Sequence, residues 1–197
     1  MSNSLSDSSN ARKYLTEEEL KRLLHVIQGC KSARDVAIFL VTYWRGLRAS
    51  EVGRIPLSAW NQSKRRLFVT RLKGSLCGEF PLSKVEQSAL NAWLKIRGRE
   101  PGPLFPSRES GMIGSGIGRK MLHVLMRRYA TAALLPTHLR HMHCLKHALG
   151  THLIAKGAGI YEVKDWLGHK DIRSTLVYAQ FRNAERDAAA QKVYEQG

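Results

Sequence analysis

The first residues that could do chemistry are two cations in the first half of the chain. Arg48 stands in the segment GLRASE, where a helix is expected to begin, and Glu51 follows three residues later. An arginine there can point into a pocket while the acid fixes its guanidinium fork, although a surface ion pair would give the same spacing. Lys73 falls on the turn RLKG, and a lysine at a hairpin tip can reach into a groove.

Histidines, a lysine and a tyrosine gather in the last third of the chain. His143, Lys146 and His147 fall within one turn at the start of a predicted helix, so they share a face. A helix start favours phosphate binding through its free amide groups and its macrodipole. His169 follows a helix-breaking glycine in WLGH, and Tyr178 comes nine residues later on the next predicted helix. On periodicity alone, Tyr178 would be a half-buried aromatic residue.

The elements that must position these residues are mostly helices. Thr16 and Glu19 form a predicted capping box, and residues 66–72 and 79–82 read as two strands around a turn. We therefore predict a fold that is mainly α with a small antiparallel β-sheet of two or three strands, an α+β class. The predicted helices span residues 17–29, 34–43, 50–54, 83–97, 117–130, 139–155, 160–167, 172–179 and 184–194.

The charge of the chain indicates a polyanionic partner. Lys and Arg total 32 against 16 Asp and Glu, a formal net charge of +16. This excess favours nucleic acid over an anionic membrane surface, and over a charge that serves only solubility. Each single cation has a second interpretation as a solvated surface charge. The candidates for DNA phosphate contacts are Arg65, Arg66, Arg119, Lys120, Arg127, Arg128, Arg173 and Arg182.

Other classes of protein are disfavoured. No apolar run approaches the ~18 residues of a membrane span, and the N-terminus lacks an apolar signal region, so we expect a cytoplasmic protein. Cys30, Cys77 and Cys144 are odd in number and form no C-x-x-C pair, which indicates reduced thiols. His143 and His147 have a spacing that can bind zinc, but no H-E-x-x-H motif or nearby carboxylate accompanies them. We therefore predict no metal and no cofactor.

Together, the motifs resemble those of the tyrosine recombinase, or phage integrase, family. The family pattern is an arginine in G-L-R-x-S-E, a lysine on a β-hairpin, H-x-L-R-H, L-G-H, and a tyrosine nine residues past that last histidine. GLRASE, RLKG, HCLKH, LGH and Tyr178 occur here in the same order and at the family's spacings, over residues 15–181. The resemblance implies the DNA breaking-rejoining catalytic fold. It also implies a site-specific recombinase that works through a covalent 3′-phosphotyrosine intermediate.

The resemblance implies a role for each motif residue. Arg48 would clamp the scissile phosphate with Glu51 as its brace, Lys73 would protonate the departing 5′ oxygen, and Tyr178 would be the nucleophile. An attacking phenolate adds charge to an anionic phosphodiester, so positioned cations and donors must stabilise that charge. The aryl ester keeps the bond energy, so religation needs no ATP, and no metal is needed where side chains supply the charge.

The remaining motif residues include one departure from the family. His143 and His169 would hydrogen-bond the phosphate or assist proton transfer, with His147 close behind them. Lys146 replaces the second arginine of the family pattern and would provide a point charge instead of a planar fork. Three outcomes follow from this replacement: the enzyme works with Lys146, Arg140 reaches in to compensate, or cleavage is lost and DNA binding remains.

The expected organisation is a flexible tail at 1–13, a catalytic domain at 14–182, and a helix or tail at 183–197 that docks on a neighbouring protomer or ends in solvent. It is similar to the compact members of the family, such as the fimbrial phase-variation recombinases. The implied partners are double-stranded DNA, further copies in a tetramer, and an accessory DNA-binding protein, in a bacterial or phage- or plasmid-derived, nucleoid-associated setting. The alternatives are a cleavage-impaired DNA-binding regulator and a basic architectural protein.

Overall fold

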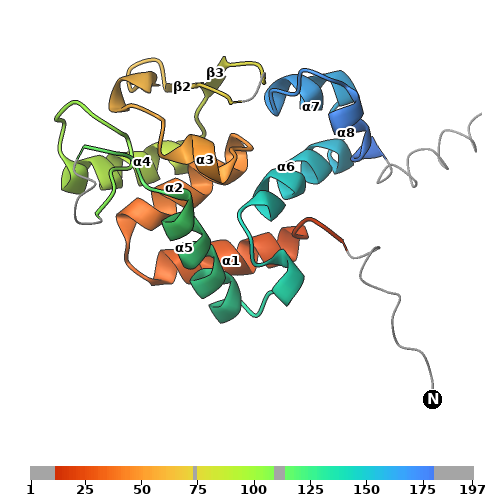
Figure 1. Cartoon of the computed structure of the whole chain (residues 1–197), viewed down its shortest axis with the longest axis horizontal. Helices are drawn as coiled ribbons and strands as arrows, with labels where there is room; N and C mark the ends of the chain where they lie inside the picture. Colours follow the sequence, from red (N-terminus) through yellow and green to blue (C-terminus); the bar gives the residue numbers. More distant parts are fainter. Residues whose placement is uncertain (1–11, 73–74, 109–113, 180–197) are drawn as a thin grey trace, which may run out of the picture.

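The computed structural model describes residues 12–72, 75–108 and 114–179. Within these ranges the chain is mainly helical with a three-stranded antiparallel sheet, which confirms the predicted α+β class (Figure 1). None of the described helices has both the length and the apolar content to cross a bilayer. The elements are α1 (Glu17–Gly29), α2 (Ala33–Trp44), α3 (Ala49–Val52), β1 (Trp60–Asn61), β2 (Arg66–Val69), β3 (Gly78–Pro81), α4 (Lys84–Arg97), α5 (Arg119–Ala132), α6 (His143–Ala155), α7 (Ile160–Trp166) and α8 (Arg173–Leu176).

The first helix begins as its sequence predicts. Thr16 Oγ1 accepts a hydrogen bond from Glu19 N at 3.2 Å, and Glu19 Oε2 accepts one from Thr16 N at 2.9 Å, so both halves of the capping box are present. Leu20, Leu23 and Ile27, which repeat at helical spacing, are buried. Since α1 contacts α2 and α5, these side chains join the central core.

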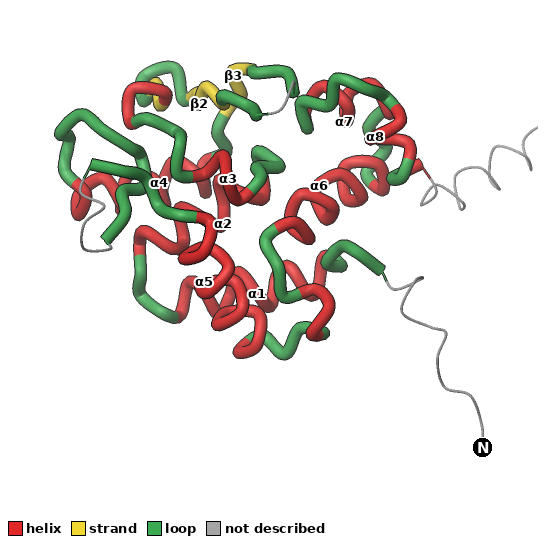
Figure 2. The backbone as a smooth tube through the Cα atoms, viewed as in Figure 1, coloured by secondary structure: helices red, strands yellow, loops and turns green. Residues whose placement is uncertain are grey.

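The second helix is the centre of that core. The run 37–41 on α2 is entirely buried, as expected for a helix that is apolar on several faces. It contacts α1, α3, α4 and α6. Figure 2 shows α1, α3, α4 and α6 around α2, and the short strands along one edge of the molecule. Arg48 lies four residues after the end of α2, so this buried helix positions the start of the first motif.

The sheet has the order β1-β2-β3, with β2 in the middle. Leu67 pairs with both Trp60 and Phe80, and Leu67 and Val69 face the core. The ladder ends at Val69, opposite the first residue of β3, so β2 is shorter than the predicted strand 66–72. The two-residue strand β1 was not predicted. The inward alternation nevertheless continues two residues beyond the ladder to Arg71, which is also buried.

The last helices differ from prediction in their lengths. α6 begins at His143 instead of residue 139, because residues 137–139 after Pro136 form a separate 3-10 turn. α8 is a four-residue helix, and Tyr178 lies in the turn that follows it. The predicted helix 184–194 falls outside the described residues. Since α6 contacts both α2 and α7, and α7 contacts α8, the segment that carries Tyr178 is held close to the central helix.

Candidate active site

Arg48 and Glu51 form the first part of the site. Arg48 caps the start of α3, and its Nη1 donates to Glu51 Oε1 and to Ser75 Oγ, both at 2.9 Å. Glu51 is fully buried and accepts from the amides of Arg48 and Leu72 at 2.8 and 3.1 Å. Burial alone would raise the pKa of Glu51, but these hydrogen bonds and the charge of Arg71 outweigh it and lower the pKa. Glu51 is therefore an ionised brace.

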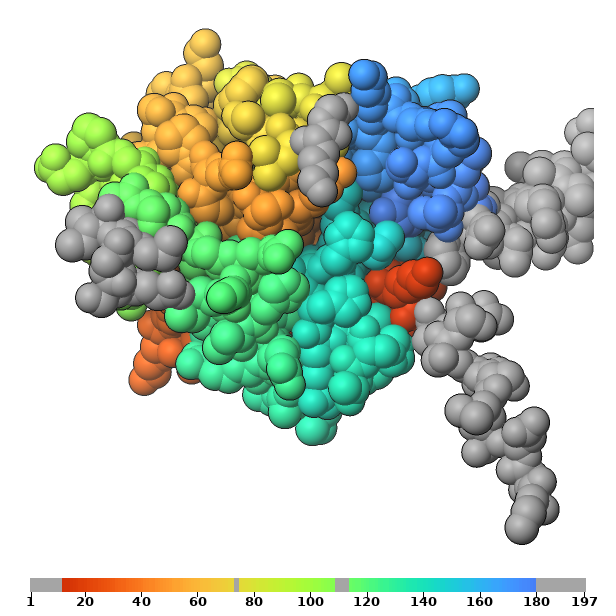
Figure 3. Space-filling model, viewed as in Figure 1, coloured from red at the N-terminus to blue at the C-terminus, as the bar shows by residue number. Residues whose placement is uncertain are grey.

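The guanidinium of Arg48 opens onto a pocket of ≈ 330 Å³. Its side chain is 30% exposed. Within the described part of the chain, its side-chain hydrogen bonds all leave from Nη1, which leaves Nη2 and Nε for a bound anion. Arg119, His123 and His143 line the same pocket. On the face in Figure 3, the orange segment around residues 45–55, green α5 and cyan α6 meet. Several potential cations thus surround one space.

Lys146 lies in the interior next to this pocket. It is 2% exposed, and its Nζ donates to the carbonyl oxygen of Leu167 at 2.9 Å. Burial, followed by the charges of Arg71 and Arg48, lowers the pKa of Lys146 to about 7. At neutral pH the lysine is therefore divided between its charged and neutral forms.

Tyr178 lies buried against α6. It is 3% exposed, and its hydroxyl is 3.1 Å from His147 Nδ1. Its ring stacks on His169, with 6.5 Å between ring centroids and 12° between the planes. The ring also approaches Gly150, where a Cβ would come within 2.7 Å of ring atoms. Burial raises the pKa of Tyr178 to about 12, so the phenol needs a proton acceptor before it can attack.

Two neutral imidazoles flank this phenol. Gly168, with φ +66°, ends the preceding turn, and His169 Nδ1 lies 2.9 Å from Thr175 Oγ1. Burial, and then the charge of Lys146, lowers the pKa of His169 to about 4. Burial likewise lowers the pKa of His147 to about 4. At pH 7 each ring therefore has one nitrogen that donates and one that accepts a hydrogen bond.

Electrostatic interactions link the two ends of the chain at this site. The charge of Arg48 is among those that lower the pKa values of His143, Lys146 and His169, in each case after the larger effect of burial. His169 in turn stacks on Tyr178. Contacts make the same connection, because Arg48 and His143 line one pocket, His143 meets His147, and His147 lies 3.1 Å from the hydroxyl of Tyr178. A guanidinium from the first quarter of the sequence and a phenol from the last part therefore belong to one cluster.

Comparison with known proteins identifies the family of the chain. The family model described as "Phage integrase family" matches residues 13–185. The chain belongs to the phage integrase family, the tyrosine recombinases. This tyrosine recombinase is 31% identical to the type 1 fimbriae regulatory protein FimE of Escherichia coli K12 over 183 residues, which are 90% of this chain and 89% of FimE. It is 32% identical over 186 residues to the tyrosine recombinase XerC of Pseudomonas aeruginosa LESB58, covering 89% of this chain and 58% of XerC.

A solved structure shows the same fold. The XerH site-specific recombinase, in a post-cleavage complex with palindromic difH substrate, matches with a TM-score of 0.76 and 20% identity. The match covers 94% of this chain and 55% of XerH. This tyrosine recombinase thus spans little more than half the length of XerC and of XerH. At this low identity the XerH match establishes the fold, and the chemistry must be argued from the residues.

The predicted site residues are brought together wherever they are described. Lys73 lies outside the described residues, but its neighbours Leu72 and Ser75 contact Arg48. Among the described residues, no group of three His, Cys, Asp or Glu side chains is arranged to hold a metal ion. The predicted members of the cluster are Arg48, Glu51, His143, Lys146, His147, His169 and Tyr178.

The predicted DNA contacts divide into several groups. Arg119 lines the pocket beside Arg48. Arg66 and Arg173 donate to carboxylates of Glu79 and Asp171, each at 2.7 Å, so their charges are already partly neutralised. These two cations are consequently weaker candidates for phosphate than their exposure alone suggests.

The remaining basic candidates lie in other surroundings. Arg65 lines a separate polar hollow beside α4 together with Lys84 and Lys95. Arg128 donates to the hydroxyl of Tyr129 at 2.9 Å. Arg182 lies outside the described residues. The two remaining candidates, Lys120 and Arg127, are exposed on α5.

Arg140, the predicted substitute for the missing arginine, is held by contacts on the turn after α5. Its Nε donates to the carbonyl oxygen of Leu135 at 2.8 Å, and its Nη1 donates to Thr131 Oγ1 at 3.0 Å. These contacts hold its side chain on the turn after α5. In this structure the compensation suggested by the sequence is therefore absent.

Sequence reasoning missed Arg71, a buried arginine at the centre of the site. Its side chain is fully buried and donates to three backbone carbonyl groups. A signal was present in the sequence, because Leu67, Val69 and Arg71 alternate with period two. That pattern predicts an inward-pointing position, and an inward-pointing cation requires internal partners.

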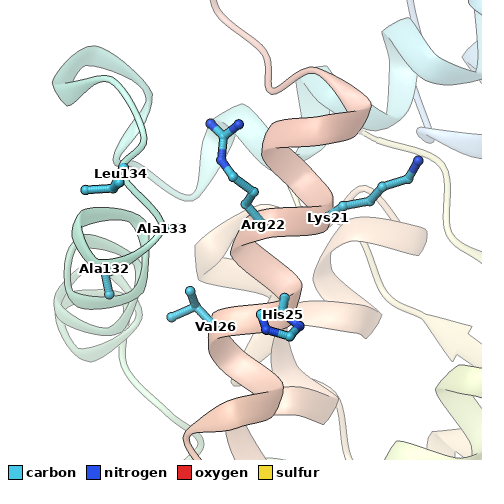
Figure 4. A pocket seen from close by; sticks show the side chains of 7 residues that line it. All are labelled: Lys21, Arg22, His25, Val26, Ala132, Ala133 and Leu134. Carbon is cyan, nitrogen blue, oxygen red and sulfur yellow. The ribbon is translucent and has the colours of Figure 1, made fainter.

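A second hollow lies between α1 and the end of α5, away from the residues of the site (Figure 4). Val26 and Leu134 provide apolar surface there, and Lys21, Arg22 and His25 lie along α1. In Figure 4 the side chains of Lys21 and Arg22 point in different directions, so they do not converge on one anion. This hollow therefore does not resemble the Arg48 pocket as a site for an anion.

Proposed function

We propose that this tyrosine recombinase cleaves and rejoins double-stranded DNA at specific sites through a 3′-phosphotyrosine at Tyr178. One observation carries the proposal: the hydroxyl of Tyr178 lies 3.1 Å from His147 Nδ1, and its ring stacks on His169. The same cluster includes Arg48, which lines a pocket together with Arg119 and His143. A nucleophile, a proton acceptor and an anion-binding cation are thus in one place.

The proposed reaction is a transfer of the phosphoryl group between two oxygens. The oxygen of Tyr178 bonds to the scissile phosphorus, its proton passes to the imidazole of His147, and the bond to the 5′ oxygen breaks. Lys73 supplies the proton that the departing 5′ oxygen takes up. Attack by the freed 5′ hydroxyl of a second strand reverses these steps and releases Tyr178, so ATP is not needed.

The charge of the transition state would be stabilised mainly from the pocket side. Arg48 is held by Glu51, so its guanidinium needs little reorganisation when the phosphate gains charge. Arg119 and His143 line the same pocket and can donate to the remaining phosphate oxygens. Because the protein's own donors and cations can provide this stabilisation, we propose a reaction that requires no metal.

The proposed partner is duplex DNA bound by several copies of the chain. The net charge of +16 favours a polyanion, and XerH was solved with its difH substrate. We propose that residues 14–182 are the catalytic domain, that 183–197 dock on a neighbouring protomer in a tetramer, and that an accessory DNA-binding protein assists. The setting we propose is the bacterial cytoplasm at the nucleoid.

A nicked suicide substrate tests the proposal. When the strand breaks near the nick, a short fragment diffuses away and the phosphotyrosine cannot be reversed. We expect a covalent protein–DNA complex on a denaturing gel with the wild type, and none with Tyr178→Phe, because phenylalanine has no nucleophile. The control is Tyr161→Phe, since Tyr161 on α7 is 74% exposed and lies outside the cluster.

The two variants give opposite expectations, so the assignment is easily contradicted. A covalent complex that persists in Tyr178→Phe would show that another residue attacks. Loss of the complex in Tyr161→Phe but not in Tyr178→Phe would have the same consequence. The DNA affinity of both variants, measured without nicks, is expected to match the wild type.

Lys146 favours a second candidate function, that of a cleavage-impaired DNA-binding regulator. Its Nζ donates to the carbonyl of Leu167 instead of lining the Arg48 pocket. The suicide substrate separates this function from recombination, because such a regulator would bind the DNA and form no covalent complex. Competition with unrelated DNA separates both from a purely architectural protein, which would bind all sequences equally.

A further inference from the structure

We propose that Arg71 is a positioning residue for DNA cleavage, whose buried guanidinium fixes the Arg48 loop, the His169 turn and the strand end that leads to Lys73. This inference rests on the proposed recombinase function. Arg71 is not among the motif residues, and it has no access to the substrate because its side chain is fully buried. It would therefore act through the residues that it holds.

The hydrogen bonds of Arg71 connect segments that are distant in sequence. Its Nη1 donates to the carbonyl oxygen of Gly46 at 2.9 Å, and its Nη2 donates to that of Arg45 at 2.6 Å. These carbonyls precede Arg48 by two and three residues. Nη2 also donates to the carbonyl of Trp166 at 3.1 Å, three residues before His169. One planar group therefore sets the spacing between two motifs.

The contact between the hairpin and the His169 turn is tight. Leu76 N donates to the carbonyl oxygen of Gly168 at 3.0 Å. A Cβ at Gly168 would lie 2.7 Å from the carbonyl oxygen of Leu76 and 3.1 Å from Arg71 Nε. There is consequently no room for the turn to move toward the hairpin, and a shift of Arg71 would be transmitted to His169.

The charge of Arg71 gives a second argument against a purely structural role. Within the described residues its nearest carboxylate partner is Glu51, at 3.5 Å, and that carboxylate already binds Arg48 at 2.9 Å. A buried cation with so little neutralisation is a costly way to connect backbone segments. Its placement does, however, add positive potential beside Lys146 and His169, whose pKa values it lowers.

Arg45 provides a matched control. It is 2% exposed, compared with 5% for Arg71, so both are buried arginines. The guanidinium of Arg45 lies over the ring of Trp166, with 5.1 Å from Cζ to the ring centroid, and it donates to the carbonyl of Pro81 at 2.7 Å and to Glu86 at 3.0 Å. Replacing either arginine removes a buried cation beside Trp166, but only replacement of Arg71 removes the hydrogen bonds to the backbone before Arg48 and to the carbonyl of Trp166.

The experiment compares Arg71→Met, Arg71→Lys and Arg45→Met with the wild type. Single-turnover rates of covalent complex formation are measured on the nicked substrate, with DNA affinity and thermal unfolding in parallel. We expect Arg71→Met to lower the rate on the order of 100-fold, the cost of a displacement of about 1 Å, with DNA affinity unchanged. Arg71→Lys, which keeps the charge but not the fork, should fall between Arg71→Met and the wild type.

A pH profile distinguishes positioning from stability. The groups that act on Lys146 are Arg71 and Arg48, which lower its pKa, and Glu51, which raises it. Removing the Arg71 charge should therefore move the alkaline limb of the rate profile upward in pH, whereas Arg45→Met should leave it in place. A structural role alone would destabilise both variants without this shift.

The outcomes separate this inference from the function on which it rests. If the wild type forms no covalent complex, the recombinase proposal fails and the inference fails with it. If the wild type cleaves and Arg71→Met cleaves as fast as Arg45→Met, only the role of Arg71 is overturned. If Arg71→Met does not fold, the decision passes to Arg71→Lys, which keeps the charge and therefore the pH profile, and a wild-type rate in that folded variant would overturn the proposal.

Discussion

Lys146 stands where the family pattern has an arginine, and its surroundings show how a lysine is held there. Its ammonium group has a single carbonyl partner, Leu167, among the described residues. An arginine would bring a planar fork that can serve a carbonyl and a phosphate oxygen together, and it would stay charged at any ordinary pH. The lysine keeps the position of the charge but makes that charge dependent on pH.

This dependence predicts a difference between the wild type and Lys146→Arg. The pKa of Lys146 is lowered to about 7, so the charge is present below that pH and is lost above it. One pH unit above the midpoint, roughly tenfold less of the charged lysine remains. The rate of wild-type cleavage should therefore fall at alkaline pH. The midpoint of this fall should lie above the pKa of free Lys146, because a bound phosphate favours the charged lysine. Lys146→Arg should keep or raise the rate and should lack this fall.

Single-turnover rates between pH 6 and 9 would check this prediction. Lys64→Arg is a suitable control, because Lys64 is exposed on the turn before β2 and lies outside the site. An inactive Lys146→Arg beside an active wild type would contradict the role given to Lys146. So would an alkaline fall that is the same in both proteins.

At the scale of elements, one face of α6 carries several of the residues that surround Tyr178. His143, His147 and Gly150 follow each other at spacings of four and three residues, so they lie on one face of the helix. His143 meets His147 edge to face, with ring centroids 4.5 Å apart, and His147 meets the hydroxyl of Tyr178. Gly150 lets the ring of Tyr178 lie against the helix backbone. The absence of a side chain at Gly150 thus makes room for the ring of the proposed nucleophile.

Gly150→Ala is expected to displace the nucleophile. A Cβ there would lie 2.7 Å from the ring of Tyr178, so the ring must move away from His147 or His169. We expect the cleavage rate to fall on the order of 100-fold. The added contact should cost about 1–3 kcal/mol of stability, partly offset by the roughly 1 kcal/mol that alanine gains over glycine in a helix. Suicide-substrate kinetics and thermal unfolding would measure both effects.

Gly29→Ala is the matched control for this substitution. Gly29 is the last residue of α1, and a Cβ there would meet no atom within 4 Å. We expect unchanged cleavage and equal or higher stability. Wild-type cleavage by Gly150→Ala would show that Tyr178 works equally well in another position.

At the scale of the whole molecule, the basic residues that produce the net positive charge lie in different surroundings and cannot all contact DNA. Arg71 and Arg45 are buried and hold backbone segments or other helices. Arg66 is paired with Glu79 on the sheet surface. Arg119, in contrast, lines the pocket beside Arg48. The net charge therefore overstates the number of cations that can meet DNA phosphates.

Salt titration of DNA binding should resolve these groups. Arg119→Ala is expected to reduce the slope of log affinity against log salt by about one, because one phosphate contact is lost. Arg66→Ala should change the slope less, because its cation already has a carboxylate partner at 2.7 Å. Equal slopes for Arg119→Ala and the wild type on specific DNA would place the pocket away from the phosphate backbone.

The sequence by itself determined the family and the fold class, and it named most of the residues that the structure brings together at the candidate site. These follow from local signals: the capping box at Thr16, the helical periodicity of α1, and motifs such as HCLKH and LGH that keep their order and spacing. Such signals depend on residues a few positions apart, which interact whatever the rest of the chain does. The exact ends of β2 and α6 depended on partners elsewhere in the fold and were predicted less well.

The tertiary structure decided how these residues behave chemically. Only the packing of α6 against the chain end gives Tyr178 a raised pKa and a contact with His147. Arg71 is buried and connects distant segments only because the end of β2 packs against the end of α7, where Arg71 donates to the carbonyl of Trp166. Desolvation and contacts between distant segments produce both effects, and neither has a local signature strong enough to assign a role from the sequence.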